Sequence, residues 1–168
     1  MVCERIIGKA GDAEFAQKPL DYVDFEWHET YSKLHRKISR GGRDIAIHLD
    51  DSVLKTGIKP GDVLGVDADG TVIAADVEAA DVLCAKVGEP LFLRASKIAY
   101  EIGNCHAPLF AGKDDGELVT IYTEPMESLL KSFGAQVERR TQKLDFGRQI
   151  SSVVGHSHHH ESHERHGH

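Results

Sequence analysis

The chain of 168 residues has few cysteines, no long apolar run and no excess of basic residues. Its three cysteines, Cys3, Cys84 and Cys105, are widely separated and form no CxxC pair, which argues against a disulfide framework and for a reducing compartment. No stretch approaches the roughly 18 apolar residues of a membrane helix. The first residues also lack the basic and then apolar pattern of a signal peptide. We therefore expect a cytoplasmic protein.

The charge balance excludes some partners. With 20 Lys and Arg against 27 Asp and Glu, the formal net charge is −7, which does not favour nucleic acid or an anionic membrane surface. A hydrophobic fraction of 40% and a charged fraction of 28% are ordinary for a globular protein, and the length allows one domain or two small ones.

Residues 1–75 predict an N-terminal all-β domain, to which we assign partner binding. Residues 22–29 alternate, with Val23, Phe25 and Trp27 on one face, and residues 44–49 alternate in the same way. Short strands separated by glycine-containing turns predict a small sandwich or open barrel. Three histidines fall on these strands as solvated residues, and they are His28, His35 and His48.

Residues 76–147 predict a second domain with the order β-α-β-β-α-β. A helix begins near Pro90, carries apolar residues at helical spacing and ends at Gly103, where a left-handed cap suits glycine. A second helix begins near Glu124 and ends at Gly134, and the last strand covers residues 137–146. This order is the ferredoxin-like arrangement, so the predicted fold class is α+β.

Residues 148–168 predict a flexible tail that binds metal through histidine. From residue 155 onward there is no apolar side chain to bury, so we expect disorder without metal. Imidazole suits nickel, copper and zinc, and open, exchangeable sites fit metal delivery or buffering better than folding. A purification tag is the other reading, although Ser, Glu, Arg and Gly interrupt the run. The candidate tail ligands are His156, His158, His159, His160, His163, His166 and His168.

His106 is the remaining candidate ligand, in the segment Gly103-Asn104-Cys105-His106-Ala107-Pro108-Leu109. A lone histidine after a helix is more often structural than a ligand, and one imidazole does not make a metal site. Two would, if a two-fold axis of a homodimer placed His106 of both subunits side by side. The tail histidines would then complete the coordination.

This segment resembles the GNRHxPL signature of the UreE-type urease accessory proteins. The resemblance extends to the start of the chain, at residues 4–8, 25–27 and 42–47, and to the histidine-rich C-terminus. It implies a nickel metallochaperone, not an enzyme, that passes Ni²⁺ to the urease apoprotein together with other accessory proteins, including the maturation GTPase. It also implies that residues 76–147 dimerise and that His106 of both subunits bridges one ion.

Two alternatives and one departure from the signature remain. The chain would otherwise be a general nickel or zinc buffer without a urease client. A catalytic Cys105–His106 dyad is disfavoured, because sequence neighbours rarely present nucleophile and base to each other. Cys105 stands where the signature has arginine. It is either a soft ligand that favours copper or zinc over nickel, or it points away from His106 along an extended chain, which we prefer.

Overall fold

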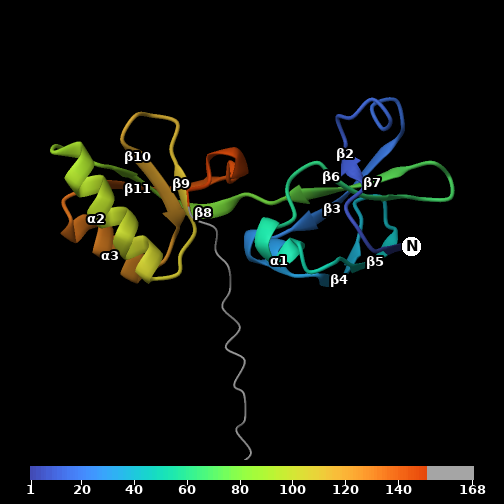
Figure 1. Cartoon of the computed structure of the whole chain (residues 1–168), viewed down its shortest axis with the longest axis horizontal. Coiled ribbons are helices and arrows are strands. Elements are labelled where there is room, and N and C mark those ends of the chain that lie inside the picture. Colours follow the sequence, from blue (N-terminus) through green and yellow to red (C-terminus); the bar gives the residue numbers. More distant parts are fainter. Residues whose placement is uncertain (151–168) are drawn as a thin grey trace, which may run out of the picture.

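The computed structural model describes residues 1–150 as two domains side by side, joined where the chain leaves β7 and enters β8 (Figure 1). The first domain contains β1 to β7 and the second contains β8 to η2. The α+β fold expected from the sequence is confirmed. The expectations for residues 151–168 lie outside the described residues.

The N-terminal domain is a sandwich of two small sheets. One sheet has the order β1-β5-β4 and the other has the order β2-β6-β7-β3. Ile45 and Ile47 of the first sheet pack against Phe25 and Ile73 of the second in a common core. The elements are β1 (Val2–Cys3), β2 (Gly8–Lys9), β3 (Leu20–Phe25), η1 (Trp27–Tyr31), β4 (Leu34–Ile38), β5 (Asp44–His48), α1 (Val53–Thr56), β6 (Asp62–Val66) and β7 (Val72–Val77).

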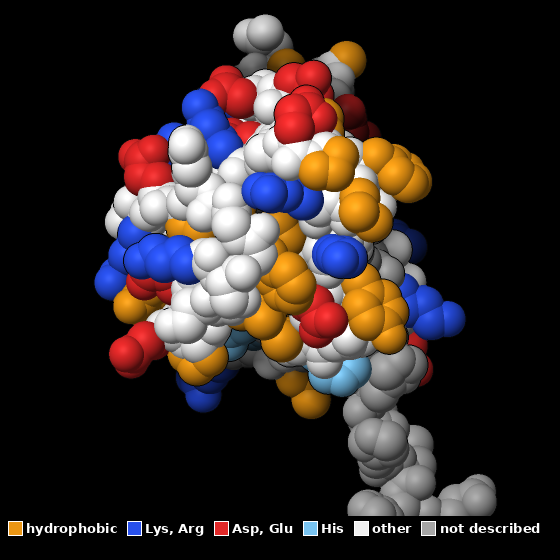
Figure 2. Space-filling view, turned by 90° about the vertical axis from the view of Figure 1, so that its left-hand side faces the viewer, with side chains coloured by type: hydrophobic (Ala, Val, Ile, Leu, Met, Phe, Trp, Pro, Cys, Tyr) orange, Lys and Arg blue, Asp and Glu red, His pale blue; other side chains and the backbone are white. Residues whose placement is uncertain are grey.

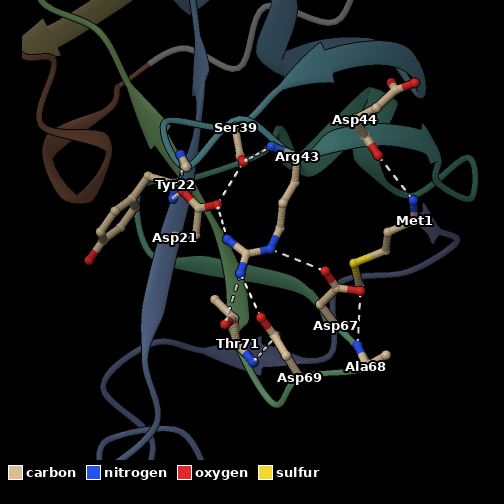
Figure 3. A network of polar contacts seen from close by, with 11 residues as sticks. Met1, Asp21, Tyr22, Ser39, Arg43, Asp44, Asp67, Ala68, Asp69 and Thr71 are labelled. Carbon is tan, nitrogen blue, oxygen red and sulfur yellow. Dashed lines mark hydrogen bonds and ion pairs between the residues drawn. The ribbon is translucent and has the colours of Figure 1, made fainter.

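Arg43, in the turn before β5, links the two sheets of this domain at one end (Figure 3). Its guanidinium donates to Asp21 of β3 at 2.8 Å, to Asp67 at 3.1 Å and to Asp69 at 2.8 Å. Asp67 and Asp69 lie in the turn between β6 and β7, and the side chain of Asp21 is only 6% exposed. One cation therefore links both sheets and offsets the cost of a buried carboxylate.

The C-terminal domain has the predicted β-α-β-β-α-β order. Its antiparallel sheet has the order β11-β8-β10-β9, in which each helix connection skips one strand, as in ferredoxin-like folds. Ile98 and Ile102 of α2, with Leu130 of α3, pack on one face of this sheet. The elements are β8 (Ala80–Lys86), α2 (Leu91–Asn104), β9 (Leu109–Ala111), β10 (Glu117–Ile121), α3 (Glu124–Ser132), β11 (Gln136–Gln142) and η2 (Phe146–Arg148).

The short helix η1 of the N-terminal domain contacts the C-terminal domain at both of its ends. Trp27 packs against the cluster on the other face of the C-terminal sheet, which includes Phe110 and Leu144. Tyr31, at the other end of the same turn, accepts a hydrogen bond from the Gln149 side-chain amide at 2.9 Å. Two aromatic residues four positions apart therefore hold the domains together, and the ion pair between Lys143 and Asp76 of β7 adds a further link.

Several local predictions differ from the structure. The expected strand over residues 22–29 ends at Phe25, because Trp27 leaves the N-terminal core to pack on the other domain. The first helix of the second domain continues through Gly103 to Asn104. The last strand ends at Gln142, and Leu144 turns back into the cluster that holds Trp27.

Candidate metal centre

The helix α2 delivers His106, and its buried residues explain why it forms. Ile98 and Ile102 lie four residues apart on the face that packs on the sheet. At its end, the His106 N–H donates to Gly103 O at 2.9 Å and the Ala107 N–H donates to Ile102 O at 3.2 Å. These two bonds form a Schellman motif, which satisfies the last carbonyl groups of the helix.

His106 occupies the left-handed position of this motif, with φ 53°. Within residues 1–150 it is the only non-glycine residue with positive φ. A Cβ atom makes this conformation costly, by about 1–2 kcal/mol, so glycine or asparagine normally fills the position. The prediction that Gly103 caps the helix is therefore wrong by three residues, and a histidine takes the strained position. Strain of this kind is characteristic of functional residues.

The imidazole of His106 is exposed and borders a hollow of about 400 Å³. The hollow has a largely apolar lining that includes Pro108, Met126 and Leu129, and Trp27 reaches it from the N-terminal domain. An apolar wall lowers the local dielectric, which strengthens the bond between a cation and any ligand that reaches it.

Cys105 lines the same hollow, and it is the one exposed thiol among the three cysteines. Burial raises the pKa of the Cys3 and Cys84 thiols, which disfavours their thiolate forms. The argument that Cys105 points away from His106 assumed an extended chain. Cys105 instead adopts φ −79° and ψ 1° as the last residue of the helical turn, so this argument fails.

The remaining described histidines lie elsewhere. His28 is in η1, with its Nδ1 atom 3.4 Å from a carboxylate oxygen of Glu26. His35 is half-buried, and its ring makes a T-shaped contact with the Phe25 ring at a centroid distance of 5.1 Å, so it is less solvated than expected. Only His48 is an exposed strand residue, as expected.

The described part of one subunit does not provide a complete metal site. Residues 1–150 contain no group of three or more His, Cys, Asp or Glu side chains with a geometry suited to a metal ion. The hollow brings together one imidazole and one thiol, together with the thioether of Met126. A four-coordinate ion would need further ligands from outside these residues.

The last described residues, Gln149 and Ile150, lie next to this centre. Gln149 forms an antiparallel bridge with Phe110, and the Ile150 N–H donates to Leu109 O at 2.8 Å. Because the bridge is antiparallel, the chain runs from Phe110 toward Leu109, which is the end of β9 nearer to His106. All seven predicted tail ligands, from His156 to His168, lie beyond the described residues.

Sequence reasoning missed Trp27 and Met126 as residues of this centre. Alternation predicts only that Trp27 is an inward residue of a strand, and nothing in the sequence singles out Met126. The available signal was the single tryptophan at the end of an alternating segment. So large an apolar ring usually packs against another part of the protein.

Comparisons with known proteins agree with this architecture. The family model for the N-terminal domain of the UreE urease accessory protein matches residues 3–78, and the C-terminal domain model matches residues 80–168. The two matches divide the chain between β7 and β8, where the sheets change.

Relatives that match over most of their length belong to the same family. A urease accessory protein UreE of Helicobacter pylori (strain G27) is 34% identical over 157 residues, which cover 94% of this chain and 90% of that protein. A urease accessory protein UreE of Acetivibrio thermocellus is 31% identical over 144 residues, 86% of this chain and 89% of that protein. The chain therefore belongs to the UreE family of urease accessory proteins, and this membership supports a urease accessory role. Within residues 1–150, no helix is long and apolar enough to cross a membrane.

Proposed function

We propose that this protein is a cytoplasmic nickel metallochaperone that delivers Ni²⁺ to the urease apoprotein during assembly of its active site. Nickel is the cargo, and the protein itself catalyses no reaction. The other partners are the urease accessory proteins, including the maturation GTPase. In this scheme residues 1–75 bind partners, residues 76–147 bind metal and dimerise, and residues 148–168 supply additional histidines.

The observation that carries the proposal is the position of His106. It combines a strained backbone, an exposed imidazole and an apolar hollow in a chain of the UreE family. A solvent-exposed imidazole adds little to folding, so the strain is better explained by a ligand role than by a structural one.

A homodimer supplies the second imidazole. The helix α2 exposes three large apolar side chains, with Phe92 86% exposed, Tyr100 68% and Leu93 53%. Figure 2 views this end of the molecule and shows hydrophobic side chains gathered on it. A second copy that covers this face around a two-fold axis near the end of α2 would bring both His106 rings to one ion.

The tail supplies looser ligands to the same ion. His156 is six residues beyond Ile150, and a fully extended chain of that length spans at most about 20–22 Å. Ile150, where this stretch begins, bonds to Leu109 at the end of β9 that is nearer to His106. Tail histidines within this reach can complete the coordination or hold further ions.

The deciding experiment is a Ni²⁺ titration of His106→Ala beside the wild type, by calorimetry and by the fluorescence of Trp27. Trp27 is the single tryptophan and lines the same hollow, so Ni²⁺ bound there quenches it. One substitution removes two ligands from each shared site. We expect the tightest class of sites and its quenching to disappear while the weaker tail sites persist. Survival of the tight class would make His106 structural and leave only a buffering role for the tail.

Cys105 supports a second candidate, a general nickel or zinc buffer without a urease client. A thiolate is a softer ligand than imidazole and favours zinc or copper(I) over Ni²⁺. Cys105→Ser separates the two functions. If the variant loses zinc affinity and still restores urease activity in a deletion host, the thiol serves buffering and delivery does not require it. A wild-type protein that fails to raise urease activity in that host would favour the buffer.

A further inference from the structure

The chain contains two Asp-Gly pairs, Asp69–Gly70 and Asp115–Gly116. In such a pair the glycine nitrogen reaches the aspartate carboxyl carbon most easily, because glycine has no Cβ atom in the way. Both pairs lie in turns, one between β6 and β7 and the other between β9 and β10. Both aspartates are exposed, and the two glycines have φ 84° and 72°. Exposure and backbone conformation therefore do not distinguish the two pairs.

Hydrogen bonds restrain both reacting groups of Asp69–Gly70 (Figure 3). The Asp69 carboxylate accepts the Thr71 N–H at 2.9 Å and the Arg43 guanidinium at 2.8 Å. These bonds lower the pKa of Asp69 to about 2, so its carboxyl group stays ionised. The Gly70 N–H donates to Asp67 O at 2.9 Å. The carboxylate and the nitrogen are thus each held by other groups.

Asp115–Gly116 has neither restraint. Within residues 1–150, the Asp115 carboxylate forms no hydrogen bond or ion pair, and the Gly116 N–H has no acceptor. The turn closes through the Glu117 N–H, which donates to Asp114 O at 3.2 Å, and the Asp114 side chain pairs with Lys86 at 3.0 Å. No contact therefore keeps the Asp115 carboxyl group away from the next nitrogen.

The single asparagine is the other residue that could react in this way. Asn104 is the last residue of α2, and the N–H of the following Cys105 donates to Glu101 O at 3.0 Å. The nitrogen that would attack is part of the helix end. We expect no reaction at this position.

The reaction itself needs only water. The Gly116 nitrogen attacks Cγ of the protonated Asp115 carboxyl group, a C–N bond forms, and the carboxyl hydroxyl leaves as water with the amide proton. The product is a cyclic succinimide. Water then opens the ring at either carbonyl. Opening at the backbone carbonyl leaves Gly116 joined to the side-chain carbonyl, which is isoaspartate. One water is released and one is consumed, so the mass does not change and no oxidant is involved.

We propose that Asp115–Gly116 is a site of spontaneous modification at which aspartate converts to isoaspartate, and that the folded protein protects Asp69–Gly70. The new residue exposes an α-carboxylate, a group that the interior of an ordinary chain lacks. A carboxyl methyltransferase specific for isoaspartate can recognise it. The site does not involve His106 and does not depend on the nickel proposal.

The modified turn would press on the helix that leads to His106. Gly116 O accepts the Val87 N–H at 3.0 Å, and a Cβ atom placed on Gly116 would lie 3.0 Å from Cδ1 of Leu91, the first residue of α2. Isoaspartate lengthens the main chain by one methylene group. A contact this close has no room for the extra atom, so the turn must move away from α2.

The test incubates the metal-free full-length protein for several weeks at mildly acidic pH and physiological temperature, in water enriched in ¹⁸O. Tryptic peptides are then separated and weighed, and Lys86 and Lys113 place the two Asp-Gly pairs in different peptides. The peptide with Asp115 should gain ¹⁸O and split into two forms of the same sequence. The later conversion at Asp69 should be at least about tenfold slower, because its hydrogen bonds must break first.

Two further measurements identify the product and the cause. Purified isoaspartyl carboxyl methyltransferase with labelled S-adenosylmethionine should transfer its methyl group to the Asp115 peptide and not to the Asp69 peptide. The same incubation in guanidinium chloride should bring the two rates close together, because unfolding removes the hydrogen bonds that protect Asp69.

Variants make the assignment specific. Asp115→Glu keeps the charge but would have to close a larger ring, so it should abolish the product. Asp114→Glu makes the same change at the adjacent exposed aspartate and should leave the product unchanged. Arg43→Met removes one of the bonds to Asp69 and should speed conversion there while the rate at Asp115 stays the same.

Three results would overturn the proposal. The first is the absence of isoaspartate at Asp115 in the folded protein while the unfolded chain forms it. The second is an equal rate at Asp69 and Asp115 in the folded protein, or an unequal rate that persists unchanged in guanidinium chloride. The third is a methyltransferase signal that survives in Asp115→Glu, which would place the modified residue elsewhere.

Discussion

His106 occupies at the end of α2 the position that Gly134 occupies at the end of α3. Both residues have positive φ, 53° and 76°, and each helix closes with the same pair of backbone bonds. The Gly134 N–H donates to Lys131 O at 2.9 Å and the Ala135 N–H donates to Leu130 O at 3.3 Å. The two helix ends therefore provide a matched pair in which only the residue type differs.

Replacing His106 by glycine should stabilise the protein while it removes the ligand. Relief of the left-handed strain gains about 1–2 kcal/mol, and the added freedom of glycine in the unfolded chain offsets about 0.5–1 kcal/mol of it. Denaturant unfolding should thus show a net gain of about 0.5–1 kcal/mol, and the tightest nickel sites should be lost. The converse change Gly134→His should destabilise by a similar amount without altering nickel binding. A destabilised His106→Gly protein would mean that the imidazole has a structural role.

Removing residues 156–168 should lower the number of Ni²⁺ ions bound per dimer but leave at least one. The removed segment contains seven of the eleven histidines, while His106 and its hollow remain. Equilibrium dialysis of the truncated and full-length proteins measures the difference. Complete loss of nickel binding would place the principal site in the tail and remove the case for His106.

Nickel should strengthen dimerisation. An ion held by both subunits favours pairing by mass action. The effect should fade below about pH 6, because protons then compete with the ion for imidazole. Sedimentation at several protein concentrations, with and without Ni²⁺, gives the dissociation constants. Equal constants under both conditions would show that the ion does not bridge the subunits.

Arg43→Met should destabilise the N-terminal domain at neutral pH by about 2 kcal/mol, because it leaves the buried Asp21 carboxylate without its cation. Burial raises the pKa of Asp21, but hydrogen bonds from Ser39, Gly41 and Arg43 outweigh it, so the pKa is lowered. The bonds from the Thr71 N–H and from Arg43 lower the pKa of Asp69 to about 2. Lowered pKa values contribute stability that is present above the usual value of about 4 and is lost as the pH falls toward 2.

Calorimetric unfolding of wild type and Arg43→Met between pH 2 and pH 7 tests this. The difference in stability should be largest at pH 7 and shrink below about pH 4. Arg36→Met, which removes an exposed pair with Asp44, is the control and should change stability by no more than about 0.5 kcal/mol. A difference that does not depend on pH would mean that Arg43 acts through packing alone.

The C-terminal fold was largely predictable because its signals are local. The stripe of Met126, Leu129 and Leu130 and the glycine at 134 specify α3 without reference to the rest of the chain. The β-α-β-β-α-β order then leaves few ways to arrange the sheet. His106 was identified through the signature that it shares with a known family.

What the sequence did not reveal depends on contacts between distant residues. Alternation places His35 and Leu34 on opposite faces of β4 but does not say which face is inside. In the structure the face with His35 is the inner one, because the His35 ring packs on Phe25. Trp27 likewise continues the pattern of its strand, and only the neighbouring domain explains why it leaves the sheet. The left-handed conformation of His106 was hidden because a nearby glycine was the expected cap.

The turn η1 has one more consequence. It lies between β3 and β4, and Trp27 at its start lines the hollow at His106 while Tyr31 at its end bonds Gln149. A displacement of this turn therefore acts on both places at once. If a partner that contacts this turn changes the nickel affinity by some factor, thermodynamic reciprocity requires that nickel change the affinity for that partner by the same factor. An empty and a loaded carrier would then differ in how long they stay with a partner, and the turn would convert cargo status into residence time.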